Sequence, residues 1–289
     1  MTALVLPETR ISDYIALLKP RVMSLVVFSG ACGMLVAPGS IHPVLGLVSI
    51  LALALGAGAA GAINMWYDRD IDAVMTRTKN RPIPAGLVNP DEALGFGITL
   101  SIISIILMAL SAGYMAASIL AFANVFYSVV YTIWLKRHTP QNIVIGGAAG
   151  AFPPMIGWVA VTGHIDLAAI VLFMIIFLWT PPHFWALALY SSDDYKRAKI
   201  PMMPCIAGEK ATKRQMLAYT IALIPVSIAP YYMGVANIGY AISAGILGLF
   251  FILAALRVMQ ETEGTKAARQ MFGYSIFYLF AIFTALVVF

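Results

Sequence analysis

Nine long apolar segments occupy most of this sequence. They cover residues 22–37, 44–66, 93–112, 114–135, 142–161, 167–190, 216–233, 237–256 and 271–289. A hydrocarbon core about 30 Å thick is crossed by roughly 20 apolar residues in a helix. The chain is 11% charged, whereas a soluble globular domain is about 25% charged. We therefore predict an all-α, polytopic membrane protein with nine transmembrane helices around a central cavity, and exclude a soluble globular domain.

Every lysine and arginine lies on one side of this nine-helix arrangement. All 18 precede the first segment or fall in the gaps after segments two, four, six and eight, and the other gaps have none. Lysine and arginine mark the cytoplasmic side of a membrane protein. We predict a cytoplasmic N-terminus, an external C-terminus and a multi-pass protein of a bacterial plasma or inner membrane. The net charge of +5 then reflects topology and the lipid bilayer, with no nucleic-acid partner.

The acidic residues show the same asymmetry. Twelve of the 13 lie on the predicted cytoplasmic side, and Asp166 is the exception. Acidic residues contribute little to the positive-inside effect, so another cause must hold them there. The two longest cytoplasmic loops, 67–92 and 191–215, are four helices apart and both contain acidic clusters. We interpret residues 1–289 as one domain of two four-helix units, whose acidic loops meet over one cavity at the cytoplasmic face.

The first acidic cluster has a regular spacing. Asn64, Asp68 and Asp72 follow one another at intervals of four residues at the inner end of the second segment. On a helix this spacing forms one stripe of oxygen ligands, and Mg²⁺ is commonly held by one or two carboxylates plus substrate phosphates. The alternative is a solvated, acidic helix end. Asn64 favours the metal site, because a polar residue within an apolar segment is costly and usually functional.

Basic residues close to both acidic clusters are candidates for holding a diphosphate. Arginine offers a bidentate fork to phosphate oxygens and lysine offers a point charge. The stiff segment Pro82-Ile83-Pro84 would fix the loop beside the metal stripe. The alternative is an ordinary positive-inside signal or attraction to anionic lipid. The candidate diphosphate ligands are Lys19, Arg77, Arg81, Lys196 and Lys199.

The motifs around these residues resemble those of the UbiA family of intramembrane prenyltransferases. The pattern N-x-x-x-D-x-x-x-D from Asn64 is followed by R-T-x-x-R-P-I-P-x-G from Arg77. Three further stretches, 136–158, 180–188 and 193–204, are similar to the heme-farnesylating branch of that family. The resemblance implies Mg²⁺-dependent transfer of a farnesyl group from farnesyl diphosphate to a vinyl group of protoheme IX (heme B), with addition of water. The products would be heme O and diphosphate, and contacts with other heme-pathway or oxidase-assembly proteins are a further implication.

The resemblance also implies a second metal motif, D-x-x-x-D, from which this sequence departs. Asp194 is followed four residues later by Ala198, and Asp193 by Arg197. The second carboxylate is therefore missing, and we expect an asymmetric site. The candidate catalytic residues are Asn64, Asp68, Asp72 and Asp194, of which the first three are the candidate metal ligands.

Two histidines are candidates for binding heme. His183 follows two prolines about two turns inside the sixth segment, where a neutral imidazole would ligate heme iron or hold a propionate. The alternative is a buried histidine bonded to a carbonyl of a neighbouring helix. His138 lies in a cytoplasmic loop beside Lys136 and Arg137, where propionate contact and simple solvation are both open.

Two other functions remain alternatives at this point. A UbiA-type enzyme that prenylates a quinone precursor would share the aspartate motif but would lack the stretches 180–188 and 193–204. A transporter of heme or another anion would also need polar groups in the membrane. The nearly uncharged outer side argues against a transporter, because it leaves no polar path across the bilayer.

Overall fold

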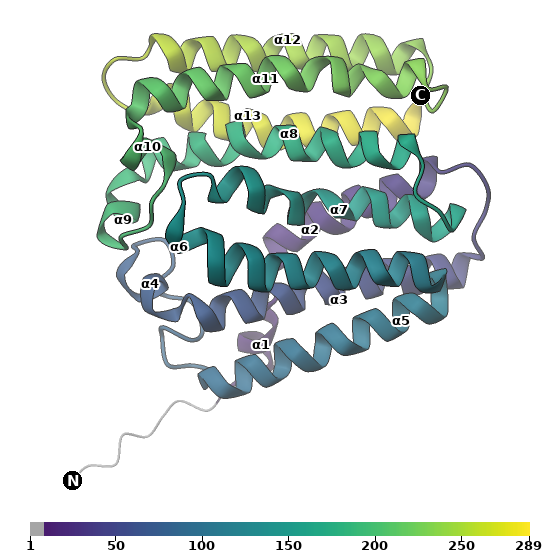
Figure 1. Ribbon diagram of the computed structural model, residues 1–289, viewed down its shortest axis with the longest axis horizontal. Coiled ribbons are helices and arrows are strands. Elements are labelled where there is room, and N and C mark those ends of the chain that lie inside the picture. The colour runs from purple at the N-terminus through teal and green to yellow at the C-terminus, as the bar shows by residue number, and fades with distance from the viewer. Residues whose placement is uncertain (1–8) are drawn as a thin grey trace.

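The computed structural model describes residues 9–289, which form helices and loops with no strand in that range (Figure 1). The all-α prediction is confirmed. The first eight residues of the predicted domain lie outside the described residues. The helices are α1 (Ile11–Leu17), α2 (Pro20–Val36), α3 (Pro43–Tyr67), α4 (Arg69–Val74), α5 (Pro90–Val125), the π-helix η1 (Phe126–Leu135), α6 (Lys136–His138), α7 (Asn142–Thr162), α8 (Leu167–Tyr190), α9 (Ser192–Arg197), α10 (Met203–Ile206), α11 (Gly208–Tyr232), α12 (Ile238–Gln260) and α13 (Lys266–Val288).

Local sequence signals set several helix starts. Proline occupies the first turn of α2, α3 and α5, where its missing N–H costs no hydrogen bond. The side chains of Asn89, Asp166 and Asn237 accept hydrogen bonds from backbone N–H groups at the starts of α5, α8 and α12. These caps satisfy donors that a helix leaves unpaired at its N-terminus.

Six helical runs of the described chain are long and apolar enough to cross a membrane, or seven if the bent pair α1 and α2 counts as one span. One of the six runs, Pro90–His138, contains 49 residues. It reverses at Gly113, whose φ of 85° and ψ of 172° are not helical. Figure 1 shows this run doubling back on itself. The reversal matches the predicted division between segments three and four.

The long helices lie side by side (Figure 1). The short helices α4, α6, α9 and α10 all lie at the end of the bundle where α3 ends. These short helices belong to the charged loops of the sequence. The fold therefore brings most charged loop segments to one end of an otherwise apolar bundle.

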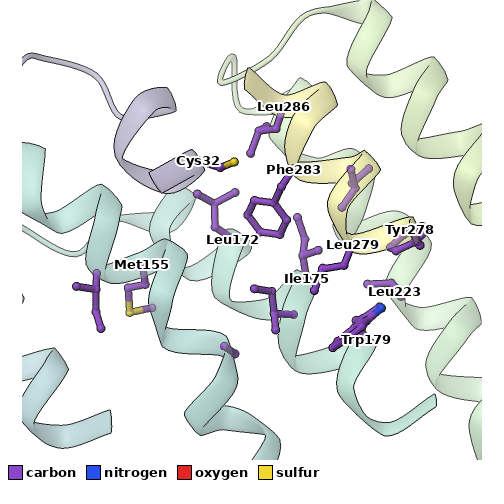
Figure 2. Packing of buried hydrophobic residues seen from close by; sticks show 14 of the residues in the cluster. Cys32, Met155, Leu172, Ile175, Trp179, Leu223, Tyr278, Leu279, Phe283 and Leu286 are labelled. Atoms are coloured by element: carbon purple, nitrogen blue, oxygen red, sulfur yellow. The ribbon is translucent and has the colours of Figure 1, made fainter. Parts of the chain in front are cut away.

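The main hydrophobic core is built on α8 and α13. Figure 2 shows Leu172 and Ile175 of α8 beside Leu279 and Phe283 of α13, and each of the four is about 1% exposed. Close packing of this kind gives a membrane bundle its van der Waals attraction, because burial from lipid alone supplies little. The core fixes α8 against α13, which matters for the polar groups described below.

The crossing of α2 and α7 depends on glycine, which yields the first prediction. A Cβ atom on Gly157 would overlap the carbonyl oxygen of Gly30, whereas a Cβ on Gly150 of the same helix would meet open space. We expect Gly157→Ala to lower stability by about 1–3 kcal/mol, as overpacking does, and Gly150→Ala to leave it nearly unchanged. Thermal unfolding of the purified protein in detergent measures both, and equal midpoints for the two variants would contradict this account of the crossing.

Candidate active site

The stripe predicted from the four-residue spacing exists at the end of α3. Helix α3 ends at Tyr67, and the backbone bonds from Asp68 N to Asn64 O and from Asp72 N to Asp68 O continue the helical path into α4. Asn64, Asp68 and Asp72 are 3%, 0% and 2% exposed. Burial of this degree does not fit a solvated helix end, because charged groups are buried only when they are paired or bind ions.

Basic and amide side chains surround this stripe. Lys136 forms an ion pair with Asp68, and Arg81 Nη1 lies 2.6 Å from Asp72 Oδ2. Lys19 Nζ donates to Asn64 Oδ1 over 2.5 Å. The amide nitrogen of Asn64 donates to Asp68 Oδ2 over 2.7 Å. Each member of the stripe therefore has a cationic partner brought from another part of the chain.

Arg137 joins the buried aspartate to an exposed one. Its guanidinium makes two hydrogen bonds to Asp70, of 2.7 and 2.8 Å, and lies 3.7 Å from Asp68 Oδ1. Hydrogen bonding to Arg137 holds the pKa of Asp70 below its usual range. Asp70 is therefore a structural partner of Arg137 on the exposed side of α4.

The π-helix η1 supplies further residues that the sequence reasoning did not place in the site. Thr132 Oγ1 accepts a hydrogen bond of 3.0 Å from Asn64 Nδ2, and Lys136 follows directly after η1. The rings of Tyr127 and Tyr131 pack with centroids 5.3 Å apart. The sequence signal for Lys136 was its place at the end of an apolar segment, where a basic side chain often pairs with an acid. Its partner Asp68 is 68 residues away and could not be read from local spacing.

The predicted diphosphate loop folds back onto the stripe. Thr78 Oγ1 donates to the carbonyl oxygen of Asp72 over 3.0 Å, and Arg81 N donates to Thr78 O. These bonds bring Arg81 to Asp72. Arg77 of the same loop is exposed, so its side chain is accessible to a ligand.

The acidic cluster of loop 191–215, Asp193 and Asp194, contacts the loop 67–92 through Asp194. Thr76 Oγ1 donates to Asp194 Oδ1 over 3.0 Å, and Arg197 bonds both residues. Asp193 is 87% exposed and pairs weakly with Lys196 at 3.9 Å. Of the two adjacent aspartates, Asp194 is therefore the one that contacts the loop of the first motif. Among the predicted diphosphate ligands, Lys196 and Lys199 are both exposed.

The two candidate heme histidines lie in different surroundings. His183 is buried in α8, and its Nδ1 lies 2.7 Å from the hydroxyl of Ser275 in α13. The partner of His183 is therefore a hydroxyl side chain, whereas a purely structural histidine was expected to bond a backbone carbonyl of a neighbouring helix. His138 is exposed, and its Nδ1 lies 2.5 Å from the carbonyl oxygen of Trp134. The structure does not bring the two histidines into contact.

A cavity of about 300 Å³ opens beside the stripe. It lies at the elbow between α1 and α2 and is lined by Ala16, Lys19, Pro20, Arg21, Val22, Met65 and Arg81. The elbow bends by 57° at Lys19, whose φ of 53° is left-handed. Two of the cations that contact the stripe, Lys19 and Arg81, therefore also face this cavity.

The oxygen atoms at the stripe fit a magnesium ion that shares its shell with a substrate. Within residues 9–289 no group of three or more His, Cys, Asp or Glu side chains is placed to hold a metal ion. Asp68 Oδ1 is buried, however, and has no hydrogen-bond partner among the described residues. Two carboxylates and the amide oxygen of Asn64 are a sufficient protein contribution for Mg²⁺ when phosphate oxygens complete the coordination.

Comparison with known proteins shows the family of the chain. A sequence model of the UbiA prenyltransferase family matches residues 25–280. A protoheme IX farnesyltransferase of Agrobacterium fabrum is 55% identical over 97% of this chain and 90% of its own length. Another, from Brucella anthropi, is 56% identical over 99% of this chain and 93% of its own.

Solved structures share the fold at low identity. A structure of digeranylgeranylglyceryl phosphate synthase has a TM-score of 0.80 at 20% identity and covers 96% of this chain and 97% of its own. A UbiA homologue of Archaeoglobus fulgidus, bound to DMAPP and Mg²⁺, has a TM-score of 0.67 at 15% identity over 96% of this chain and 100% of its own. The architecture is thus that of known UbiA proteins.

The pair formed by Asp68 and Lys136 gives a prediction about stability. Lys136→Met leaves the fully buried carboxylate of Asp68 without its main cation, and we expect a loss of about 3–5 kcal/mol. The double variant Asp68→Asn with Lys136→Met should recover part of that loss, because no buried charge is left alone. Unfolding of the two single variants and the double variant in detergent measures the coupling.

An exposed pair is the matched control for this cycle. Lys196→Met removes the partner of Asp193, and we expect a cost below about 1 kcal/mol. Additive losses in the buried cycle, with no recovery in the double variant, would contradict the pairing.

Proposed function

Because the chain belongs to the UbiA prenyltransferase family, we propose that it transfers a farnesyl group from farnesyl diphosphate to a vinyl group of protoheme IX (heme B). Water adds in the same reaction, and the products are heme O and diphosphate. The observation that carries this assignment is the 55–56% identity, over nearly the whole chain, to proteins named protoheme IX farnesyltransferase. The stretches 180–188 and 193–204 distinguish it from an enzyme that prenylates a quinone precursor.

The stripe is the proposed metal and catalytic centre. Asn64, Asp68 and Asp72 would hold Mg²⁺ together with diphosphate oxygens, and Asp194 would support the same site through its contact with Thr76. Magnesium would neutralise charge on the leaving diphosphate and so ease cleavage of the allylic C–O bond. The donor set supports this proposal, since Asp68 Oδ1 is buried without a hydrogen-bond partner in the described chain.

Basic side chains of the chain would bind the diphosphate. Lys19 and Arg81 already lie at the stripe and face the cavity at the α1–α2 elbow. Arg77, Lys196 and Lys199 are exposed at the same end of the bundle and would close on phosphate oxygens from the loops. Charge-assisted hydrogen bonds of this kind favour the developing negative charge on the leaving group.

The apolar interior would hold the farnesyl chain and the heme. Exclusion of water by the bundle protects an allylic cation until the vinyl group attacks it. His183, buried in α8, and His138, exposed near Lys136, are the proposed heme contacts. The depth of His183 and the surface position of His138 suit an iron and a propionate, respectively.

We propose further that the chain crosses the membrane nine times, with its N-terminus in the cytoplasm and its C-terminus outside. Three observations support this topology. Pro90–His138 reverses at Gly113 and so has two arms, α1 and α2 make one bent pair, and α11 has 25 residues. With this topology lysine and arginine lie only on the inner side, as the positive-inside rule expects. The proposed active site would then lie at the cytoplasmic face of a bacterial inner membrane.

An assay with defined substrates tests the function. Purified protein given heme B, farnesyl diphosphate and Mg²⁺ should produce a heavier, more strongly retained heme by chromatography and mass spectrometry. Chelation with EDTA should stop the reaction, and added Mg²⁺ should restore it. An aromatic quinone precursor offered in place of heme should stay unmodified. Unchanged heme together with a prenylated quinone precursor would support the other branch of the family.

Single substitutions test the stripe. Asp68→Asn and Asp72→Asn should each lower kcat by at least about 100-fold, since each removes a carboxylate that holds the metal and leaving group. Asp193→Asn, at an exposed aspartate, is the matched control and should keep nearly full activity. Near-normal turnover in both stripe variants would rule out their metal role.

A further inference from the structure

His183 is held rigidly between two aromatic rings. It stacks on Trp179 at a centroid distance of 4.2 Å with 18° between the planes, and on Phe272 at 4.6 Å with 21°. Both faces of the imidazole are therefore covered, and only its edge is available to another group. The stacking also restricts ring rotation, so the direction of the two nitrogens is fixed.

The hydrogen bonds of Ser275 determine which nitrogen of His183 carries the proton. The hydroxyl of Ser275 donates to the carbonyl oxygen of Phe272 over 2.6 Å. A hydroxyl has one proton to donate, so Ser275 Oγ must accept from His183 Nδ1 over their 2.7 Å contact. The neutral imidazole then has its N–H at Nδ1 and its free lone pair at Nε2.

The Nε2 atom has no protein partner in the described chain. No side chain or backbone group from residue 9 to residue 289 makes a hydrogen bond to it. The atom is also not sealed off completely by the surrounding protein. His183 as a residue keeps 8% of its surface exposed. A histidine needed only for packing would leave no directed lone pair in an apolar interior, where polar groups are normally satisfied.

We propose that His183 Nε2 ligates the iron of the heme substrate and that Ser275 is the positioning residue that fixes the required tautomer. This inference rests on the proposed function, which supplies heme as the acceptor. A ligating histidine commonly donates its other ring N–H to a hydrogen-bond acceptor, which orients the ring and raises its basicity. Ser275 supplies that acceptor here, and the aromatic stack supplies the orientation.

The surroundings of His183 match the chemistry of a heme. Phe272 contacts Tyr190 edge-on at 5.8 Å, and the guanidinium of Arg269 lies 4.9 Å from the centre of the Tyr190 ring. The row of aromatic side chains thus leads from the buried histidine to the cation of Arg269, which lies near the start of α13 and beside the last residue of α8. A macrocycle with apolar faces and anionic propionates is complementary to such a gradient.

Heme titration of the purified full-length chain, without farnesyl diphosphate, tests the ligation. The wild-type protein should give the absorption and electron paramagnetic resonance spectra of histidine-ligated heme. His183→Ala should lose that signature and bind heme at least tenfold more weakly, and added imidazole should restore the spectrum. Restoration by imidazole separates ligation from a structural role, since a misfolded variant would not recover. His164→Ala, at an exposed histidine, is the control and should keep the wild-type spectrum.

Ser275→Ala tests the positioning role separately. We expect heme affinity to fall by about 10–100-fold, with Ser275→Thr retaining most of it. The bond from Trp179 Nε1 goes to the backbone carbonyl of Ser275 and survives both changes. Ser227→Ala is the matched control, because Ser227 is equally buried and bonds Tyr278 instead.

The outcomes separate this inference from the proposed function. A wild-type spectrum and affinity in His183→Ala would overturn the ligation, even if the enzyme farnesylates heme. Unchanged affinity in Ser275→Ala would overturn the positioning role. A histidine signature that His183→Ala abolishes, together with no farnesylated product from the wild-type protein, would support the ligation and contradict the proposed function.

Discussion

The carboxylate of Asp68 has no exposed surface, and this buried charge constrains the arrangement around it. An uncompensated carboxylate in a low-dielectric interior is strongly unfavourable, so the chain must bring cations to it. Lys136 forms the ion pair, Arg137 approaches from the same short helix, and Asn64 donates an amide hydrogen. The contacts of Lys136 and Arg137 hold α6, and η1 before it, against the end of α3. The site is therefore part of what determines the packing at this end of the bundle.

The same compensation extends outward to the loops. Asp72 draws Arg81, and Thr78 closes the loop onto the backbone of Asp72. Asp194, from the loop 191–215, accepts a hydrogen bond from Thr76 of this same loop. Segments more than 100 residues apart in sequence are thus linked by polar contacts at one end of an apolar bundle, and the opposite end has no comparable network in residues 9–289. These contacts give a physical reason why acidic residues accompany the basic ones in the loops on the predicted cytoplasmic side.

Much of this organisation follows from local sequence, and some does not. Apolar length predicts helices, and the spacing of Asn64, Asp68 and Asp72 predicts one stripe, because both depend on the geometry of a single helix. The reversal at Gly113 could also be predicted locally, because this glycine separates two apolar segments that are each long enough to form a helix. The pairing of Lys136 with Asp68 depends on how two helices meet, and the elbow at Lys19 depends on a left-handed backbone residue. The π-helix η1 and the tautomer of His183 likewise arise from tertiary contacts, which no local period encodes.

The charges at the stripe indicate how a site so fully paired can still bind substrate. Arg81, Lys136 and Arg137 pair with three carboxylates, those of Asp72, Asp68 and Asp70. Lys19 bonds the amide of Asn64, so its ammonium is one positive charge in excess. In the proposed reaction magnesium adds two positive charges, and a prenyl diphosphate adds roughly three negative ones. The loaded site would then be close to neutral, so binding need not bury a net charge. The cations would exchange carboxylate oxygens for phosphate oxygens while the metal takes their place at Asp68 and Asp72, and an apolar bundle can tolerate that exchange because the total charge of the site stays small.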